Sequence, residues 1–257
     1  MKSLKITLVA VYIIIIILLL LGLLRCEHRQ RGTSPDRDTI VSDENPQIKE
    51  KFKADVVMCI DCSGSMTYMI NTVKNNAMTF YSDLKQKCIA EGKEITSMRV
   101  KVIGFRDLSD IRPFEESSFF DLPSEEKEFR NFVSKLQALG GGIDIPEHSY
   151  DALAMAINSS WNTGRDVHHI IILWTDAGSH PLSGKNGVPT TTEELTALWH
   201  DKMNAKNKRL ILFAPTESTW IMLKQQWDKT TLHDVNAGGG LSDLDYEEIL
   251  KTLSERI

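Results

Sequence analysis

Residues 54–65 are Ala-Asp-Val-Val-Met-Cys-Ile-Asp-Cys-Ser-Gly-Ser, and this stretch decides the fold that the sequence predicts. Its first seven residues are mostly apolar and predict a buried strand at Ala54–Ile60. A D-x-S-x-S motif, Asp61–Ser65, follows that strand directly. Aspartate, serine and glycine are also ordinary turn formers, so the motif alone fits a turn with a helix cap as well as a binding loop.

Strand-like and helix-like segments alternate through the rest of the chain. The segment 167–175 (VHHIIILWT) is the most apolar of them, and such continuous runs are typical of strands covered on both faces. The alternation predicts an α/β fold: a doubly wound, mostly parallel, six-stranded sheet flanked by helices on both faces. Further strands are expected at 98–105, 114–120 (short, at a sheet edge), 209–214 and 231–235. Helices are expected at 67–90, after Ser124, which is placed to cap its helix, from Pro146, at 192–207, at 220–227 and at 241–257.

The N-terminal segment is far more apolar than the rest of the chain. Residues 6–24 carry no charged side chain, and at 1.5 Å per residue they would form a helix of about 29 Å, enough to cross a hydrocarbon core. A cleaved signal peptide is the alternative, because Lys2 and Lys5 precede the run. The run is longer than a usual signal-peptide core, and no A-x-A-like site follows it. We therefore expect a short tail at 1–5 and a retained single-pass anchor at 6–24.

The remainder of the chain divides into a linker and one domain. Residues 25–50 are polar, charged and poor in aromatic side chains, which is typical of a solvated linker. Residues 52–257 suit a single globular domain. The formal net charge of -5 leaves no basic stripe for nucleic acid, so nucleic-acid binding is not expected. Basic residues flank the anchor on both sides, so its orientation stays open.

Cys59 and Cys62 form a C-x-x-C, a spacing found in redox and zinc sites. No second C-x-x-C and no H-x-x-x-H accompanies it, whereas a structural zinc site needs four ligands. Cys59 also lies within an apolar run, where a buried thiol behaves as a small hydrophobic group. We expect the two thiols to be structural.

Acidic residues follow two of the predicted central strands. Asp61 follows the first, and Asp176 follows 167–175 in Thr-Asp-Ala-Gly-Ser. In doubly wound sheets ligands bind beyond the carboxyl ends of the strands, where the strand order reverses. Carboxylate and hydroxyl oxygens are the ligands that hard divalent cations such as Mg²⁺ prefer. The sequence therefore predicts a divalent-cation site built from these loops.

With these loops, residues 52–257 resemble the von Willebrand factor type A (VWA) family. The resemblance rests on D-x-S-x-S at Asp61–Ser65, on Thr175-Asp176 and on G-G-x-D-x-P-E at Gly141–Glu147. Gly-Phe-Arg-Asp at 104–107 and Gly-Gly-Gly-Leu-Ser at 238–242 are similar to bacterial-type members. The resemblance implies a Rossmann-like fold with a metal-ion-dependent adhesion site.

The resemblance also implies roles for individual residues. Ser63 and Ser65 would contact Mg²⁺ or Mn²⁺ directly, and Asp61 and Asp176 would lie close to it, often acting through waters. The third loop of the family often supplies a threonine, whereas the matching loop here offers Asp144. Asp144 is either a third carboxylate, which leaves the cation less positive charge for an acidic ligand, or a residue that holds a water or braces the loop.

Three other side chains lie near the predicted loops. Asp107 fits either the rim of the site or the cap of a turn, and both interpretations remain open. His148 and His180 flank the loops, where single histidines are most often solvated or hydrogen-bonded. His168 and His169 are expected at the start of a strand, away from metal.

Three functions from different classes fit this sequence. The first, implied by the resemblance, is a non-enzymatic module whose cation takes the acidic side chain of a protein partner. The second is a metal-dependent hydrolase or phosphotransferase, for which the chain offers no G-x-x-x-x-G-K-[ST] loop, no D-x-D pair after the first strand and no nucleophile clearly coupled to a base. The third is a scaffold with a purely structural metal site. We favour the first.

Overall fold

The computed structural model describes residues 47–140, 146–203 and 207–257, all of which belong to one compact unit. Among these residues seven strands form one sheet in the order β3-β2-β1-β5-β6-β7, and β4 also pairs with β2. The strands are β1 (Glu50–Asp61), β2 (Lys93–Phe105), β3 (Phe114–Glu116), β4 (Phe120–Leu122), β5 (Val167–Trp174), β6 (Lys208–Ala214) and β7 (Thr230–Asp234). The helices are η1 (Gly64–Met66), α2 (Thr67–Asn76), α3 (Phe80–Ala90), α4 (Glu126–Lys135), α5 (Ser149–Ile157), α6 (Thr192–Lys202), α7 (Ser218–Gln226) and α8 (Tyr246–Arg256).

The sheet is mostly parallel, which confirms the predicted α/β class. β1 pairs in parallel with β2 on one side and with β5 on the other, and β6 and β7 continue in parallel. The chain passes from β1 to β2 in one direction and from β5 to β6 in the other, so the strand order reverses between β1 and β5. A crevice beyond the carboxyl ends of these two strands is the expected ligand position.

The prediction of six strands was wrong, because the segment 114–120 contributes to two short strands. β3 and β4 both pair antiparallel with β2. Between them the side chain of Ser117 takes the place of a ladder partner, since its Oγ accepts from the backbone N–H of Val102 (2.9 Å). The strand is interrupted where this hydroxyl replaces a backbone carbonyl as acceptor, while the Ser117 N–H still donates to the Val102 carbonyl (2.9 Å).

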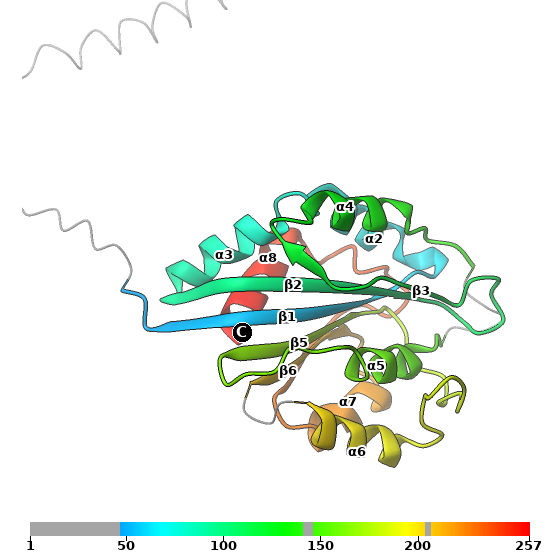
Figure 1. The fold of residues 1–257 in the computed structure, drawn as a ribbon. Helices are drawn as coiled ribbons and strands as arrows, with labels where there is room; N and C mark the ends of the chain where they lie inside the picture. The colour runs from blue at the N-terminus through cyan, green and yellow to red at the C-terminus, as the bar shows by residue number, and fades with distance from the viewer. Residues whose placement is uncertain (1–46, 141–145, 204–206) are drawn as a thin grey trace, which may run out of the picture. The chain divides into compact units, whose positions relative to one another are not determined.

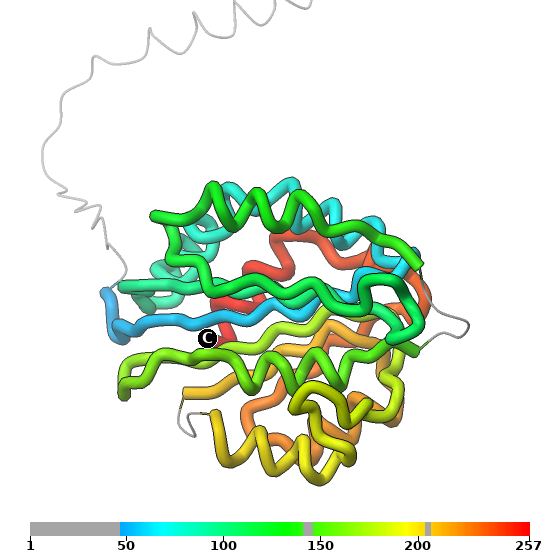
Figure 2. The backbone as a smooth tube through the Cα atoms, turned by 45° about the vertical axis from the view of Figure 1, so that its right-hand side comes forward, coloured from blue at the N-terminus to red at the C-terminus, as the bar shows by residue number. Residues whose placement is uncertain are grey.

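Helices cover both faces of the sheet (Figures 1 and 2): α2, α3, α4 and α8 lie on one face, and α5, α6 and α7 on the other. Side chains along β1 alternate between the two layers. Val56, Met58 and Ile60 belong to the core under the first group of helices, and Val57 and Cys59 to the core under the second. This alternation explains why the central strands are apolar at nearly every position.

Two helices in the first half of the domain differ from the sequence prediction. The expected helix at 67–90 is two helices, because Asn76 ends α2 with its side-chain Nδ2 donating to the carbonyl of Thr72 (2.8 Å). A side chain that bonds the last turn in this way competes with helix continuation. Ser124 does not cap α4; its Oγ donates to the carbonyl of Asp121 (3.1 Å).

Two later helices begin downstream of their predicted starts. α5 begins at Ser149 and not at Pro146, because Glu147 forms a parallel bridge with Ser179. α8 begins at Tyr246 and not at Leu241, with the Asp245 side chain accepting from the N–H of its third residue as an N-cap. In both places the residues upstream of the helix form loops at the carboxyl edge of the sheet.

The C-x-x-C thiols are buried in different layers. Cys59 belongs to the core under α5–α7, and Cys62 to the core on the opposite face. Burial raises the pKa of Cys62 to about 12, so its thiol is neutral at physiological pH. His168 and His169 are the second and third residues of β5, at its start as expected, and His168 stacks on Phe52 with ring centroids 4.3 Å apart. These side chains are structural.

Among the described residues no helix combines the length and the apolar character needed to cross a membrane. The predicted tail at 1–5 and the anchor at 6–24 lie outside the described residues, as does most of the linker at 25–50. The last residue assigned to that linker, Glu50, is already part of β1.

Candidate metal centre

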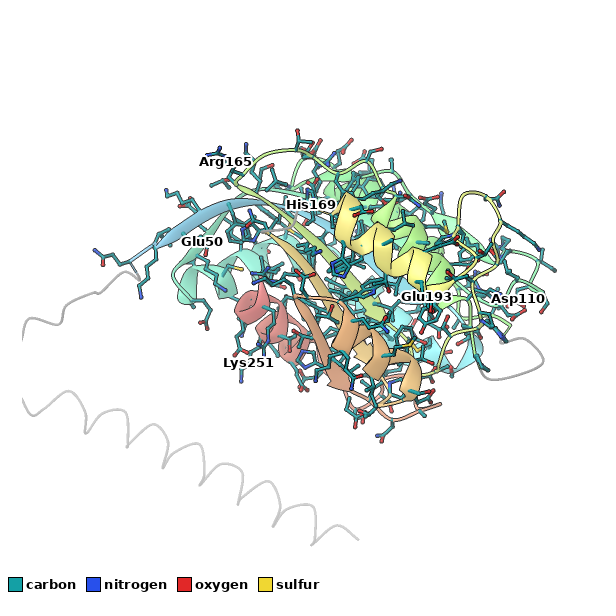
Figure 3. All side chains as sticks on the ribbon, turned by 90° about the horizontal axis from the view of Figure 1, so that it is seen from below. Glu50, Asp110, Arg165, His169, Glu193 and Lys251 are labelled. Carbon is teal, nitrogen blue, oxygen red and sulfur yellow. The ribbon has the colours of Figure 1, made fainter. Side chains whose placement is uncertain are left out.

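The loops that follow β1 and β5 meet at the point where the strand order reverses. Asp61 is the last residue of β1, and Thr175 and Asp176 directly follow β5. Figure 3 shows Glu50 and Arg165 at the opposite end of the sheet from Asp110, whose loop follows β2 at this edge. Parallel pairing of β1 with β5 thus delivers both acidic loops to one place.

Three side-chain oxygens from these loops lie at the spacing that a small hard cation requires. The two hydroxyl oxygens of Ser63 and Ser65 are 3.1 Å apart, and Ser65 Oγ donates to Asp176 Oδ1 at 3.0 Å. In an octahedral site with metal–oxygen distances near 2.1 Å, neighbouring ligands are about 3.0 Å apart. Ser65 is exposed to solvent, so the group opens at the surface. An all-oxygen set with this spacing fits Mg²⁺ or Mn²⁺.

Asp61 is fully buried, and both of its carboxylate oxygens accept hydrogen bonds. The backbone N–H of Ser63 donates to Oδ1 (2.8 Å), and the hydroxyl of Thr175 donates to Oδ2 (2.7 Å). Burial raises the pKa of Asp61 to about 6 against the effect of these hydrogen bonds, with the nearby Asp176 carboxylate adding to the rise. These contacts make Asp61 a brace for the serine loop.

The glycine-rich loop before α8 contacts both Asp176 and the serine loop. Gly240 N–H donates to Asp176 Oδ2 (2.7 Å), and Gly238 N–H donates to the Asp176 carbonyl (2.8 Å). Gly240 has φ +61°, and a Cβ at this position would lie 2.1 Å from the Ser65 carbonyl oxygen. Only glycine fits this approach. The motif at 238–242 was noted in the sequence for its resemblance to the family, but its contacts with Asp176 could not be inferred there.

Arg106 connects the backbones around the site. It is buried and donates from Nε to the Cys62 carbonyl (3.1 Å), from one terminal nitrogen to the Arg112 carbonyl (2.9 Å) and from the other to the Gln137 carbonyl (2.7 Å). Its charge is compensated by Glu115 at 3.1 Å. A guanidinium can hold three carbonyls at once because its donors form a rigid, planar fork.

Of the five predicted ligands, the structure brings four together: Asp61, Ser63, Ser65 and Asp176. The fifth, Asp144, lies within 141–145, outside the described residues. That Ser63, Ser65 and Asp176 bind a metal, with Asp61 behind them, stays a prediction that this geometry permits.

A second cluster lies on the loops after β2 and β5 and before α5. The bridge between Glu147 and Ser179, with His180 N–H donating to the Glu147 carbonyl (2.9 Å), places His148 beside His180. Asp107 Oδ2 lies 3.5 Å from His148 Nδ1 and 3.1 Å from His180 Nε2. Sequence reasoning considered these three residues separately, because no local pattern shows that the loops carrying Glu147 and Ser179 pair.

Asp107 caps a turn, which is one of the two roles that the sequence left open, and it also faces the two histidines. Its Oδ1 accepts from the Ser109 N–H (2.6 Å) and so caps a turn, while Oδ2 faces the histidines. Burial opposes ionisation of Asp107, but the Ser109 bonds outweigh it and, with the two histidines, hold its pKa below the usual value. Burial also lowers the pKa of His148, whose Nδ1 accepts from the Leu108 N–H at 3.2 Å. The cluster thus combines a carboxylate with an imidazole that is neutral at physiological pH.

No protein-family model matches the chain. Among curated proteins, the alpha-protein kinase vwkA from Dictyostelium discoideum is 28% identical to it over 144 residues, which is 52% of this chain and 22% of that protein. The chain thus spans less than a quarter of this relative's length.

Structural neighbours include a von Willebrand factor type A protein from Catenulispora acidiphila (TM-score 0.47, 15% identity, 80% of this chain and 43% of that one). They also include the pilus adhesin SpaC from Lactobacillus rhamnosus GG (TM-score 0.49, 13% identity, 82% and 31%) and the PilB minor pilin from Streptococcus sanguinis (TM-score 0.49, 10% identity, 79% and 62%). At these identities the similarity concerns the fold alone.

Proposed function

We propose that the chain is a VWA-type protein-binding module that holds Mg²⁺ or Mn²⁺ at the Asp61–Ser65 and Asp176 loops. The cation would take an acidic side chain of a protein partner as a further ligand. The observation that carries the proposal is the spacing of the Ser63, Ser65 and Asp176 oxygens, 3.1 and 3.0 Å, at the reversal of strand order.

The donor types support capture of an acidic group. Ser63 and Ser65 supply neutral hydroxyl oxygens, so a cation bound to them directly keeps positive charge for an incoming carboxylate. We propose that Asp61 and Asp176 act from close by, through water or as direct ligands. Asp144 is proposed as a further carboxylate, which would strengthen cation binding but leave less positive charge for an acidic ligand. The Gly140 carbonyl, just before its loop, accepts from Gly64 N–H (3.3 Å) in the serine loop.

Calorimetric titration of the metal-free full chain in detergent with Mg²⁺ and Mn²⁺ tests the proposal. Ser65→Ala should weaken binding about tenfold or more, because it removes the proposed direct ligand from an exposed position without opening the core. Ser82→Ala is the matched control, since Ser82 is also exposed and its hydroxyl donates only to the carbonyl of Thr79 in α3. Equal affinity in the two variants would refute the metal assignment.

Partner binding requires a separate measurement. Immobilised peptides with and without a carboxylate side chain are presented to the chain in Mg²⁺ or in chelator. Retention that needs both the carboxylate and the metal, and that Ser65→Ala removes, supports the binding module. Retention that is indifferent to chelator would favour the scaffold alternative.

A metal-dependent hydrolase or phosphotransferase is the alternative from another class. The kinase name belongs to a relative of which this chain covers 22%, and the activity of that whole protein is not transferred here. Phosphate release from ATP and hydrolysis of an activated ester, each measured with Mg²⁺ for the unmodified chain and Ser65→Ala, separate the classes. Turnover that disappears in the variant would replace the binding proposal with an enzymatic one.

A further inference from the structure

We propose that Asp107, His148 and His180 form a second metal site, which binds a transition-metal cation of the zinc class and is distinct from the all-oxygen site. This site does not depend on the proposed binding function. Its three donors come from three different loops at the carboxyl edge of the sheet.

The donor spacing fits a tetrahedral ion. Zinc binds imidazole nitrogen and carboxylate oxygen at 2.0–2.2 Å, so two ligands of one tetrahedral ion are about 3.4 Å apart. Asp107 Oδ2 lies 3.5 Å from His148 Nδ1 and 3.1 Å from His180 Nε2, and the three donor atoms all lie within 4.8 Å of one another. One ion can therefore reach all three after small side-chain rotations.

The backbone holds these donors in place. The parallel bridge between Glu147 and Ser179 sets the two histidines side by side, with ring centroids 4.8 Å apart. The Ser109 N–H fixes Asp107 through Oδ1 and leaves Oδ2 to face the histidines. A metal at His148 Nδ1 would replace the Leu108 N–H as the partner of that nitrogen, a contact of 3.2 Å at the long end of the hydrogen-bond range.

The donor types select the class of metal. Two imidazoles with one carboxylate suit zinc, nickel, copper or iron, whereas magnesium and calcium take oxygen ligands. The side chains are sheltered but not sealed: those of Asp107 and His148 are 12% and 11% exposed, and that of His180 is 21% exposed. Three protein donors leave a fourth position of a tetrahedral ion for water or for a side chain of a partner.

Zinc titration of the chelator-treated full chain in detergent, in competition with a chromophoric zinc chelator, tests the site. We expect one equivalent of zinc to bind, and His180→Ala and Asp107→Asn each to weaken it about tenfold or more. His200→Ala is the matched control, because His200 also lies beside a carboxylate, with its Nδ1 3.5 Å from Asp228 Oδ1, but belongs to no three-donor group among the described residues. The control should bind as the unmodified chain does.

X-ray absorption at the zinc edge identifies the ligands directly. The unmodified chain should show nitrogen and oxygen donors with two imidazoles, and His180→Ala should show one imidazole.

Ser65→Ala should keep full zinc affinity, and His180→Ala should keep full Mg²⁺ affinity, so failure of one site is distinguishable from failure of the other. Asp107→Asn, which preserves side-chain shape, decides the matter if circular dichroism shows that His180→Ala is unfolded. Absence of saturable zinc binding, equal affinity in Asp107→Asn and the control, or sulfur ligation would overturn the proposal.

Discussion

Gly240 lies where the loop before α8 comes closest to the serine loop. Replacing it with alanine places a Cβ 2.1 Å from the Ser65 carbonyl oxygen, at a residue whose φ is +61°. We expect Gly240→Ala to lower the free energy of unfolding by at least about 1–2 kcal/mol, the cost of the left-handed conformation alone, and to weaken Mg²⁺ binding. Urea denaturation and calorimetry measure the two effects.

Gly187→Ala is the control for Gly240→Ala. Gly187 also has a positive φ, +82°, but a Cβ there would meet nothing within 4 Å. It should lose stability from the backbone conformation alone and keep its Mg²⁺ affinity. If Gly240→Ala behaves like this control, the glycine loop does not shape the metal site.

The raised pKa of Asp61 predicts how cation binding depends on pH. Its carboxyl titrates at about 6 in the folded chain instead of 3.8, because it is fully buried. Protons then compete with the cation below about pH 6, where the apparent Mg²⁺ affinity should approach a tenfold loss per pH unit, and the affinity should level off above about pH 7. Calorimetry between pH 5 and 8 measures this, and Asp61→Asn should remove the pH dependence together with most of the affinity.

The raised pKa of Asp61 also makes the stability of the fold depend on pH. The raised pKa means that the folded chain binds this proton more tightly than the unfolded chain, so the contribution is complete below about pH 4 and is lost as the pH rises through about 6. Saturating Mg²⁺ should restore the stability lost above pH 6, since the cation then compensates the buried carboxylate. A Mg²⁺ effect on the unfolding midpoint that is as large at pH 5 as at pH 7.5 would contradict this assignment.

At the scale of elements, Arg106 holds together the loops that follow β1, β2 and α4. Arg106→Gln removes three bonds to carbonyls and leaves the half-buried Glu115 without its nearest cation. We expect a loss of about 3 kcal/mol in the free energy of unfolding. Arg112→Gln is the control, because this side chain is 57% exposed and lies 3.8 Å from the same carboxylate, so it should cost less than about 1 kcal/mol. Similar losses of unfolding free energy in the two variants would show that the buried Arg106 guanidinium has no special role.

The elements that sequence reasoning predicted well are those whose signal is local. β1 and β5 were predicted because both faces of these strands are buried, which makes them continuously apolar. β3 and β4, of three residues each, are too short to show a period, so they were merged into one strand. The start of α5 was misplaced because Glu147 is held by Ser179, a contact that no local pattern encodes.

The same contrast applies to the candidate sites. Asp61, Ser63, Ser65 and Asp176 were predicted to converge because residues after neighbouring parallel strands must meet at one edge of the sheet. The cluster of Asp107, His148 and His180 was missed as a group because its assembly requires the bridge between two loops. The brace that Thr175 provides for Asp61 was likewise invisible, although the sequence placed Thr175 at the end of a central strand.

At the scale of the whole molecule, both candidate metal sites are built from loops at one edge of one sheet. The β1 and β5 loops supply the oxygen donors, and the β2 loop supplies the carboxylate that faces the two histidines. The opposite edge begins with Glu50, where the chain enters β1 from the N-terminal segment. The chain therefore enters the described fold at the edge away from the candidate metal sites.

Residues 6–24 are predicted to anchor the chain in a membrane. Residues 6–24 carry no charge and are long enough, at about 29 Å, to cross a hydrocarbon core, so the full chain should stay in the membrane pellet after a carbonate wash. Ile14→Lys with Ile17→Lys should release it, because each lysine at the centre of a spanning helix costs about 2.5–3.5 kcal/mol. The same two positions changed to leucine keep the run apolar and should leave the chain in the pellet. A soluble mature protein that begins beyond residue 25 would show instead that the segment is a cleaved signal. If the segment is retained, protease treatment of intact cells would show on which side of the membrane the domain lies.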